Sequence, residues 1–172
     1  YNVAYILKWP FSEVSAVRGT VLGRLDRKVY LATDLITLSE PNYYGYWSGL
    51  KGEYIFDNSR ELSQNIMKGT RAKLFAEYYQ SVEDENKNLF VIGGDFRHYF
   101  KLSKTFIWAN RIAASSSFGK NRLIYYMGGV DNWLFPKFNS ETTIAQDQNY
   151  TYQTLATNMR GFHQNIRNGN SF

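Results

Sequence analysis

The main feature of the sequence is an alternation of apolar and polar side chains with a period of two. In residues 88–101 the even positions are mostly apolar, whereas the odd positions include Asp95, Arg97 and Lys101. Residues 68–80 repeat the pattern, with Arg71, Lys73 and Glu77 opposite the apolar positions. Successive side chains of a β-strand point to opposite faces, so a period of two predicts strands rather than helices.

Six stretches show this alternation, and together they predict an all-β fold in a single domain. The predicted strands cover about residues 2–9, 14–33, 43–57, 68–81, 88–101 and 104–118, and a long loop is expected over 119–168. In these stretches one face is largely apolar and the other is rich in charged side chains. The charges expected on that face include Arg71, Lys73, Glu77, Asp95, Arg97 and Arg111. The last stretch is the least regular, because Asn110 shares the apolar face.

The length of these stretches favours strands that cross a membrane. Soluble strands average about 5–6 residues, whereas a tilted membrane strand needs about 9–11. Aromatic residues lie towards the ends of several apolar faces, as in an interfacial girdle: Trp9, Tyr44, Tyr78, Phe100 and Phe106. The sequence therefore predicts part of a transmembrane antiparallel β-barrel with the charged faces inside. A soluble antiparallel barrel or sandwich also alternates and is the other interpretation.

The connections between the predicted strands differ in length. Residues 10–13 and 102–103 form tight turns, 58–67 is intermediate, and 34–42 and 82–87 are polar and irregular loops. Outer-membrane barrels have short periplasmic turns and longer external loops. The long C-terminal connection is therefore expected on the external side. An open sheet has two unpaired edges, which lipid does not tolerate, so we expect further strands of the same protein to complete it.

The composition excludes several classes of site. The 172 residues carry 20 basic and 15 acidic side chains, a net charge of +5 that is scattered along the chain and does not indicate nucleic-acid binding. There is no cysteine, which excludes disulfides, thiolate metal sites and cysteine nucleophiles. No apolar stretch reaches the about 20 residues of a membrane helix. Neither end looks like a natural terminus, so we expect a piece of a longer protein.

No catalytic or cofactor-binding pattern is recognisable in the sequence. Residues 83–85 are three adjacent acids without the ligand spacing of a calcium loop. Gly93 and Gly94 lie inside an alternating stretch and do not precede a helix, so they do not form a phosphate loop. Residues 115–117 are three serines at a predicted strand end, without the context of a nucleophile elbow. We expect no enzymatic activity, no cofactor and no metal.

The pattern changes after residue 125. An aromatic-x-Gly-Gly segment at 126–129 is followed by Arg-Gly-aromatic at 160–162 and a Gly-x-x-aromatic segment at 169–172. This series resembles the BamA, TamA and FhaC superfamily of outer-membrane barrels, also called the bacterial surface antigen family. The resemblance is specific only over residues 125–172. The abundance of tyrosine and asparagine resembles members from the Bacteroidota.

The resemblance implies a sixteen-stranded barrel in the outer membrane of a Gram-negative bacterium, with its sixth external loop folded back into the lumen. Gly128 and Gly129 then belong to the loop motif, and Arg160 is held by an acidic residue of the barrel wall. A carboxylate can hold an arginine through two hydrogen bonds. Gly161 supplies a close approach of the backbone with a positive φ, and Phe162 supplies a packing ring.

Two departures from the family pattern concern this motif. Residues 130–159 separate the glycine pair from Arg160, where the usual pattern has only a few residues. They are interpreted as an external elaboration or as a docking surface for other assembly or surface-complex subunits. The strands expected to carry the acidic partner of Arg160 lie beyond this sequence.

The function implied by the resemblance is outer-membrane protein assembly or polypeptide translocation, without a cofactor. Two alternatives are a passive porin or uptake channel, and a barrel subunit that anchors a surface or periplasmic complex. The expected partners are outer-membrane lipid and the missing strands of the same barrel.

Overall fold

The computed structural model describes all residues except 30–38, 40, 65, 130–149, 160 and 164; for Tyr150–Asn158 it describes the backbone alone. The described residues form ten strands. They are β1 (Asn2–Pro10), β2 (Ser15–Lys28), β3 (Tyr43–Asp57), β4 (Arg60–Ser63), β5 (Ile66–Ser81), β6 (Asn88–Lys101), β7 (Ile107–Phe118), β8 (Arg122–Gly128), β9 (Tyr150–Asn158) and β10 (Arg167–Gly169).

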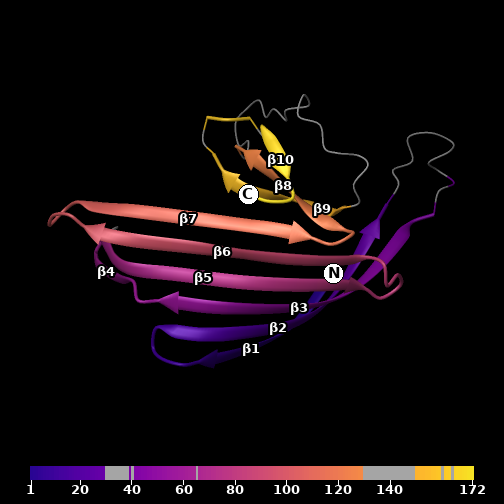
Figure 1. Cartoon of the computed structure of the whole chain (residues 1–172), viewed down its shortest axis with the longest axis horizontal. Helices are drawn as coiled ribbons and strands as arrows, with labels where there is room; N and C mark the ends of the chain where they lie inside the picture. Colours follow the sequence, from indigo (N-terminus) through magenta and orange to yellow (C-terminus); the bar gives the residue numbers. More distant parts are fainter. Residues whose placement is uncertain (30–38, 40, 65, 130–149, 160, 164) are drawn as a thin grey trace.

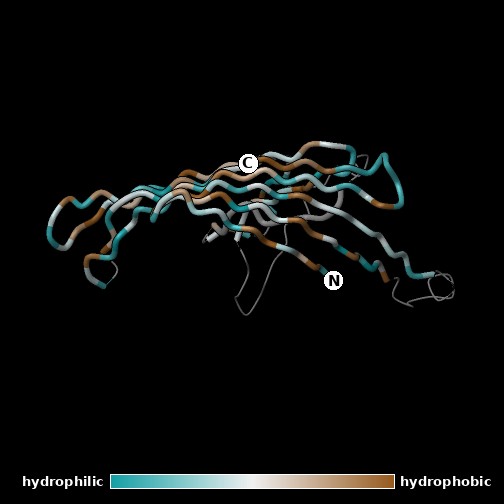
Figure 2. The backbone as a smooth tube through the Cα atoms, turned by 90° about the horizontal axis from the view of Figure 1, so that it is seen from below, coloured by the Kyte–Doolittle hydropathy of each residue, from teal (hydrophilic) through white to brown (hydrophobic). Residues whose placement is uncertain are grey.

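Six long strands form one antiparallel sheet in the order β1-β2-β3-β5-β6-β7, and the short β4 pairs with the start of β5 (Figure 1). Each long strand therefore lies beside its nearest long neighbour in the sequence, as in a meander. The strands arch along their length (Figure 2). The predicted all-β fold with antiparallel strands is confirmed.

The register of the sheet separates the side chains into two faces. One cross-strand row consists of Tyr5, Val21, Leu50, Tyr78, Phe90 and Phe118, all on the same face. We call this face the apolar face and the opposite one the polar face. The apolar face is open in the described residues: Leu74 is 61% exposed and Ile112 is 70% exposed.

The residues after β7 form a second, smaller sheet in the order β10-β8-β9, which lies beyond β7 in Figure 1. Strand β8 packs on one end of the polar face. There, buried apolar side chains of β6 and β8 form the largest cluster of the described core: Leu89, Val91, Leu123 and Tyr125, with Phe75, Tyr79 and Phe172 packed around them. The C-terminal segment therefore covers the polar face, not the apolar one.

Three predicted boundaries need correction. The single loop expected over 119–168 is wrong, because it contains β8, β9 and the start of β10. The strand expected over 104–118 begins at Ile107, since the amides of Leu102 and Ser103 both donate to the carbonyl of Phe106 and close the turn. The strand expected over 14–33 is described as Ser15–Lys28, and the last predicted residues lie outside the described part of the chain.

Gly93 supports the close packing of β5, β6 and β7, and its replacement by alanine should destabilise the sheet. A Cβ at this position would lie 2.6 Å from the Phe75 ring and 2.9 Å from the carbonyl oxygen of Ala114. We expect Gly93→Ala to lower the free energy of unfolding by about 1–3 kcal/mol. Gly52→Ala is the control, because a Cβ there meets nothing within 4 Å. Urea denaturation of the full-length protein measures both, and equal stabilities would contradict the prediction.

Candidate functional site

The polar face carries a network of ion pairs centred on the buried carboxylate of Glu53. Its Oε1 lies 2.7 Å from Nζ of Lys73 and 3.4 Å from Nζ of Lys51, and its Oε2 lies 3.2 Å from Nη1 of Arg18. The Glu53 side chain is 2% exposed. Oε1 has no well-directed hydrogen bond, so ion pairing compensates its burial. Register explains the arrangement, because Arg18 of β2 is directly opposite Glu53 of β3.

Asp95 of β6 is a second centre. Arg97 binds it through Nε to Oδ1 at 2.9 Å and through Nη2 to Oδ2 at 3.1 Å, and Nη2 of Arg111 lies 2.6 Å from Oδ2. Two further pairs extend the network, Arg71 with Asp57 at 2.9 Å and Lys51 with Glu77 at 2.7 Å. The ion pairs of this network thus lie on five adjacent strands of the sheet, β2, β3, β5, β6 and β7.

All six charged residues predicted for one face lie on the polar face, and each takes part in an ion pair: Arg71, Lys73, Glu77, Asp95, Arg97 and Arg111. Sequence reasoning also recognised the alternation around Glu53, but not that this residue is the most buried charge. Its central place in the sheet depends on the pairing of β2, β3 and β5.

A hollow of about 410 Å³ lies on this face between β2, β3, β5 and β6. Its charged lining consists of Arg18, Asp57, Arg71, Lys73, Asp95 and Arg97. Phe75 forms an apolar part of the wall, and Nζ of Lys73 lies 5.6 Å from its ring centre. This volume is within the range of small-ligand sites. The hollow is therefore large enough for a small polar molecule.

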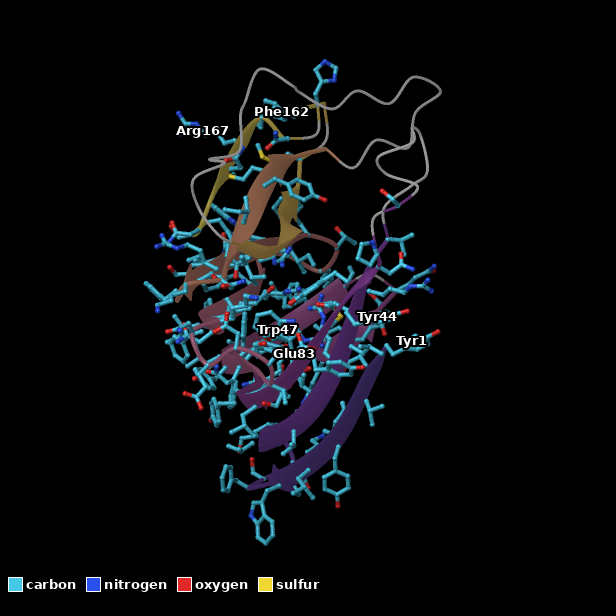
Figure 3. The ribbon with its side chains drawn as sticks, turned by 90° about the vertical axis from the view of Figure 1, so that its right-hand side faces the viewer. Tyr1, Tyr44, Trp47, Glu83, Phe162 and Arg167 are labelled. Atoms are coloured by element: carbon cyan, nitrogen blue, oxygen red, sulfur yellow. The ribbon has the colours of Figure 1, made fainter. Side chains whose placement is uncertain are left out.

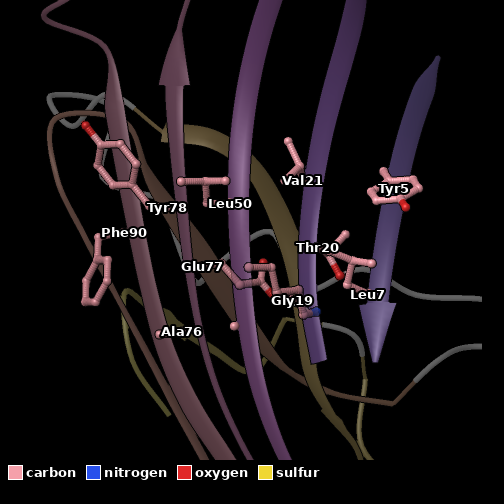
Figure 4. A pocket seen from close by; sticks show the side chains of 12 residues that line it. Tyr5, Leu7, Gly19, Thr20, Val21, Leu50, Ala76, Glu77, Tyr78 and Phe90 are labelled. Carbon is pink, nitrogen blue, oxygen red and sulfur yellow. Dashed lines mark ion pairs between the residues drawn. The ribbon is translucent and has the colours of Figure 1, made fainter. Parts of the chain in front are cut away.

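A second hollow, of about 390 Å³, lies over the apolar face of the same strands (Figure 4). Gly19 and Gly52 leave it open because neither has a side chain, and the walls include Tyr5, Leu50 and Tyr78. The two sides of the sheet thus offer different surfaces, one charged and one apolar and aromatic.

The C-terminal segment is attached to β7 by side-chain and backbone hydrogen bonds. The hydroxyl of Tyr125 lies 2.8 Å from Oγ of Ser115, and the amide of Leu123 donates to Oγ of Ser117 at 2.7 Å. Residues 170–172 then pair antiparallel with β7, as the amide of Ser117 donates to the Asn170 carbonyl. The segment therefore begins to extend the long sheet at the β7 edge.

Sequence reasoning missed this contact. Residues 115–117 lie at the end of β7, as predicted, but the sequence did not indicate that Ser115 and Ser117 are buried partners of β8. One signal was present: Leu89 and Val91 are apolar residues at positions of the otherwise charged face. Apolar side chains on a charged face indicate that something covers them.

The glycine pair and the segment 161–163 lie together. The amide of Gly129 donates to the carbonyls of Phe162 at 3.1 Å and His163 at 3.3 Å. A Cβ at Gly129 would collide with the Phe162 carbonyl oxygen. Gly128 has a φ of 143°, a backbone conformation that side chains disfavour. The two glycines therefore permit the close approach of these segments.

The other motif residues differ partly from expectation. Gly161 has the expected positive φ, 83°, but a Cβ there would meet nothing within 4 Å, so the close approach is at Gly129. Phe162 is 50% exposed and lies well away from the long sheet (Figure 3). The packing ring is Phe172 instead, whose centre lies 4.9 Å from that of Tyr125. Arg160 lies outside the described residues.

No protein family model, curated protein or solved structure matches this chain. In the described residues there is no group of three or more histidine, aspartate or glutamate side chains placed to hold a metal ion. None of the helices in that same part of the chain is long and apolar enough to cross a membrane.

Glu53 should contribute more to stability than an exposed acid does. Glu53→Gln removes the charge that compensates Arg18, Lys51 and Lys73, so we expect the free energy of unfolding to fall by about 1–3 kcal/mol. The loss should be larger at low ionic strength, where the three remaining cations repel each other more strongly. Chemical denaturation measures it, with the exposed Glu61→Gln on β4 as the control. Equal effects of the two substitutions would show that the network is not stabilising.

Proposed function

We propose that this chain is part of an outer-membrane β-barrel, with its apolar face against lipid and its polar face towards the interior. The main support for the proposal is that, in the described part of the chain, the C-terminal segment covers the polar face of the long sheet and leaves the apolar face open. Strand β8 and Phe172 lie on the polar face, while Leu50, Leu74 and their neighbours stay exposed. A soluble sandwich would instead cover the apolar face with its second sheet.

The positions of the aromatic residues support a tilted arrangement. Trp9 of β1 is level, through the cross-strand register, with Ala114 of β7, and Trp108 lies six residues before Ala114, near the turn that joins β6 and β7. A line from Trp9 to Trp108 therefore crosses from β1 to β7, which is five steps between neighbouring strands, and over that distance it shifts by six residues along the strands. At about 3.3 Å per residue and about 4.8 Å per strand, the slope corresponds to about 40°. Strands of membrane barrels tilt by about 35–45°.

A second aromatic line at the other end of the strands descends in the same direction. This line joins Tyr46 of β3 to Phe118 of β7. Phe118 is level with Leu50 of β3, and Tyr46 lies four residues before Leu50. The line therefore shifts by four residues along the strands over three steps between neighbouring strands. On β7 the two lines are ten residues apart, from Trp108 to Phe118. At a tilt of about 40° this length spans about 25 Å, the height of the apolar band of an outer-membrane barrel.

Two pairs of polar side chains on the apolar face are hydrogen-bonded to each other, as lipid favours. Oγ1 of Thr70 lies 2.7 Å from Nδ1 of His98, and Nε1 of Trp108 donates to Oδ1 of Asn110 at 2.8 Å. These groups lie near the line of aromatic residues at the turn end of β6 and β7. Their position suits a membrane–water interface, where polar tips can reach water.

Within the membrane-barrel proposal, we favour an assembly or translocation role of the BamA-like kind. The support is the resemblance in residues 125–172 together with the return of this segment over the polar face. The charged hollow on that face equally suits a passive channel, which is the second candidate. An anchoring subunit remains the third, with the surface for other subunits in residues 130–159. Further strands of the same protein would pair with the open edge of β1.

A charge on the apolar face should be costly only if that face meets lipid. Leu74→Arg places an arginine near the middle of the proposed band and should destabilise the protein in bilayers by about 2–4 kcal/mol. On a water-exposed surface the change should stay within about 0.5 kcal/mol. Leu62→Arg is the control, since Leu62 is 48% exposed on the short strand β4, outside the band. Unfolding from lipid vesicles measures both; equal, small effects would favour the soluble sandwich.

The assembly role predicts catalysed folding of other barrels. Vesicles that contain the full-length protein should speed the folding of an added, unfolded outer-membrane protein relative to empty vesicles, as measured by its heat-modifiable migration. A passive channel would leave that rate unchanged and give a large, steady conductance in planar bilayers. An anchoring subunit would do neither and would co-purify with other subunits through 130–159.

A further inference from the structure

Three arginines lie in one row across the polar face. The register places Arg71 of β5 directly opposite Arg97 of β6, and Arg97 directly opposite Arg111 of β7. Neighbouring strands are about 4.8 Å apart, so three positive charges occupy a row about 10 Å long. Like charges directly opposite each other destabilise a sheet. An arrangement of this kind needs a compensating negative charge.

The carboxylates of the network supply only part of that charge. Asp57 binds Arg71 at one end of the row, and Asp95 is shared between Arg97 and Arg111. The whole network contains six basic side chains (Arg18, Lys51, Arg71, Lys73, Arg97, Arg111) and four acidic ones (Glu53, Asp57, Glu77, Asp95). Its charge is therefore about +2 at neutral pH.

The arginines keep an open side. Their side chains are 48%, 39% and 57% exposed in the order Arg71, Arg97, Arg111. Each guanidinium has five N–H donors in a fixed fork. In the described residues, Asp57 takes up the Nε of Arg71, and Asp95 accepts from Nε and Nη2 of both Arg97 and Arg111. Strand β8 covers the far end of β6, at Leu89 and Val91, and leaves this row open.

We propose that this row and the adjoining hollow form a binding site for a small oxyanion, of the phosphate or carboxylate kind. Arg71 and Arg97 line the hollow together with Arg18 and Lys73, which adds two more cations to the wall. Guanidinium groups match the geometry of both oxyanions through paired hydrogen bonds. A low-dielectric wall below the charges strengthens the attraction. The site goes beyond the proposed barrel function, since it depends only on the polar face.

Titration of the purified full-length protein with inorganic phosphate tests the site. Calorimetry in detergent micelles, at constant ionic strength set by chloride, should show saturable binding. Arg97→Gln should weaken it by about tenfold or more, the loss expected for a hydrogen bond between charged groups. Lys101→Gln is the matched control, because Lys101 lies four residues further along β6 on the same face and outside the network. It removes the same charge and should change binding by much less.

A second variant and a second measurement distinguish a loss of phosphate binding from a loss of the native fold. Arg97→Lys keeps the charge but loses the fork, so it should bind phosphate more weakly than the parent and more tightly than Arg97→Gln. Phosphate should also raise the unfolding temperature of the parent protein, because a ligand of the native state stabilises it. Acetate in the same titration distinguishes a carboxylate preference from a phosphate preference.

Absence of saturable binding of either anion, or equal binding by Arg97→Gln and Lys101→Gln, would overturn the proposal. Because the titration is done in micelles and does not depend on an apolar face in lipid, its failure is distinguishable from failure of the barrel proposal.

Discussion

The antiparallel register of the six long strands is the constraint on which both faces depend. A shift by one residue between β3 and β5 would move Lys73 to the apolar face and Leu74 to the polar one. The ion pairs of Glu53 with Lys73 and of Asp57 with Arg71 form only in the observed register. The ion pairs on the polar face and the apolar side chains on the opposite face therefore both depend on the same pairing of β3 with β5.

The polar face has two parts with different chemistry. At one end, Leu89 and Val91 of β6 meet Leu123 and Tyr125 of β8 in a dry contact. At the other end the same strand carries Asp95 and Arg97, which belong to the charged network. Apolar packing holds the C-terminal segment at one end, and the charged end stays open in the described residues. A cover and a hollow thus share one face of the sheet.

The glycines of the C-terminal segment show how a motif acts through geometry. Gly129 brings its strand end against the Phe162 carbonyl, and the chain then returns through β10 to the β7 edge. The contact uses backbone groups at this point, so the identity of the neighbouring side chains matters less. The Phe162 ring can stay exposed because its segment is held through the backbone at Gly129. The ring that packs against Tyr125 is that of Phe172.

The sequence by itself determined the six long strands and which face their side chains occupy, because a period of two is a local property that is visible in alternating residues such as Lys73 and Leu74. It did not reveal the strands β8, β9 and β10, which lie where a single loop was predicted. It did not determine the partners. The burial of Glu53, the row of Arg71, Arg97 and Arg111, and the sharing of Asp95 arise from the offset between neighbouring strands. Nor did it determine the cover over Leu89, since that contact joins residues far apart in the chain. Only the tertiary structure brings residues of different strands together, because the distance between them depends on the conformation of all the chain that connects them.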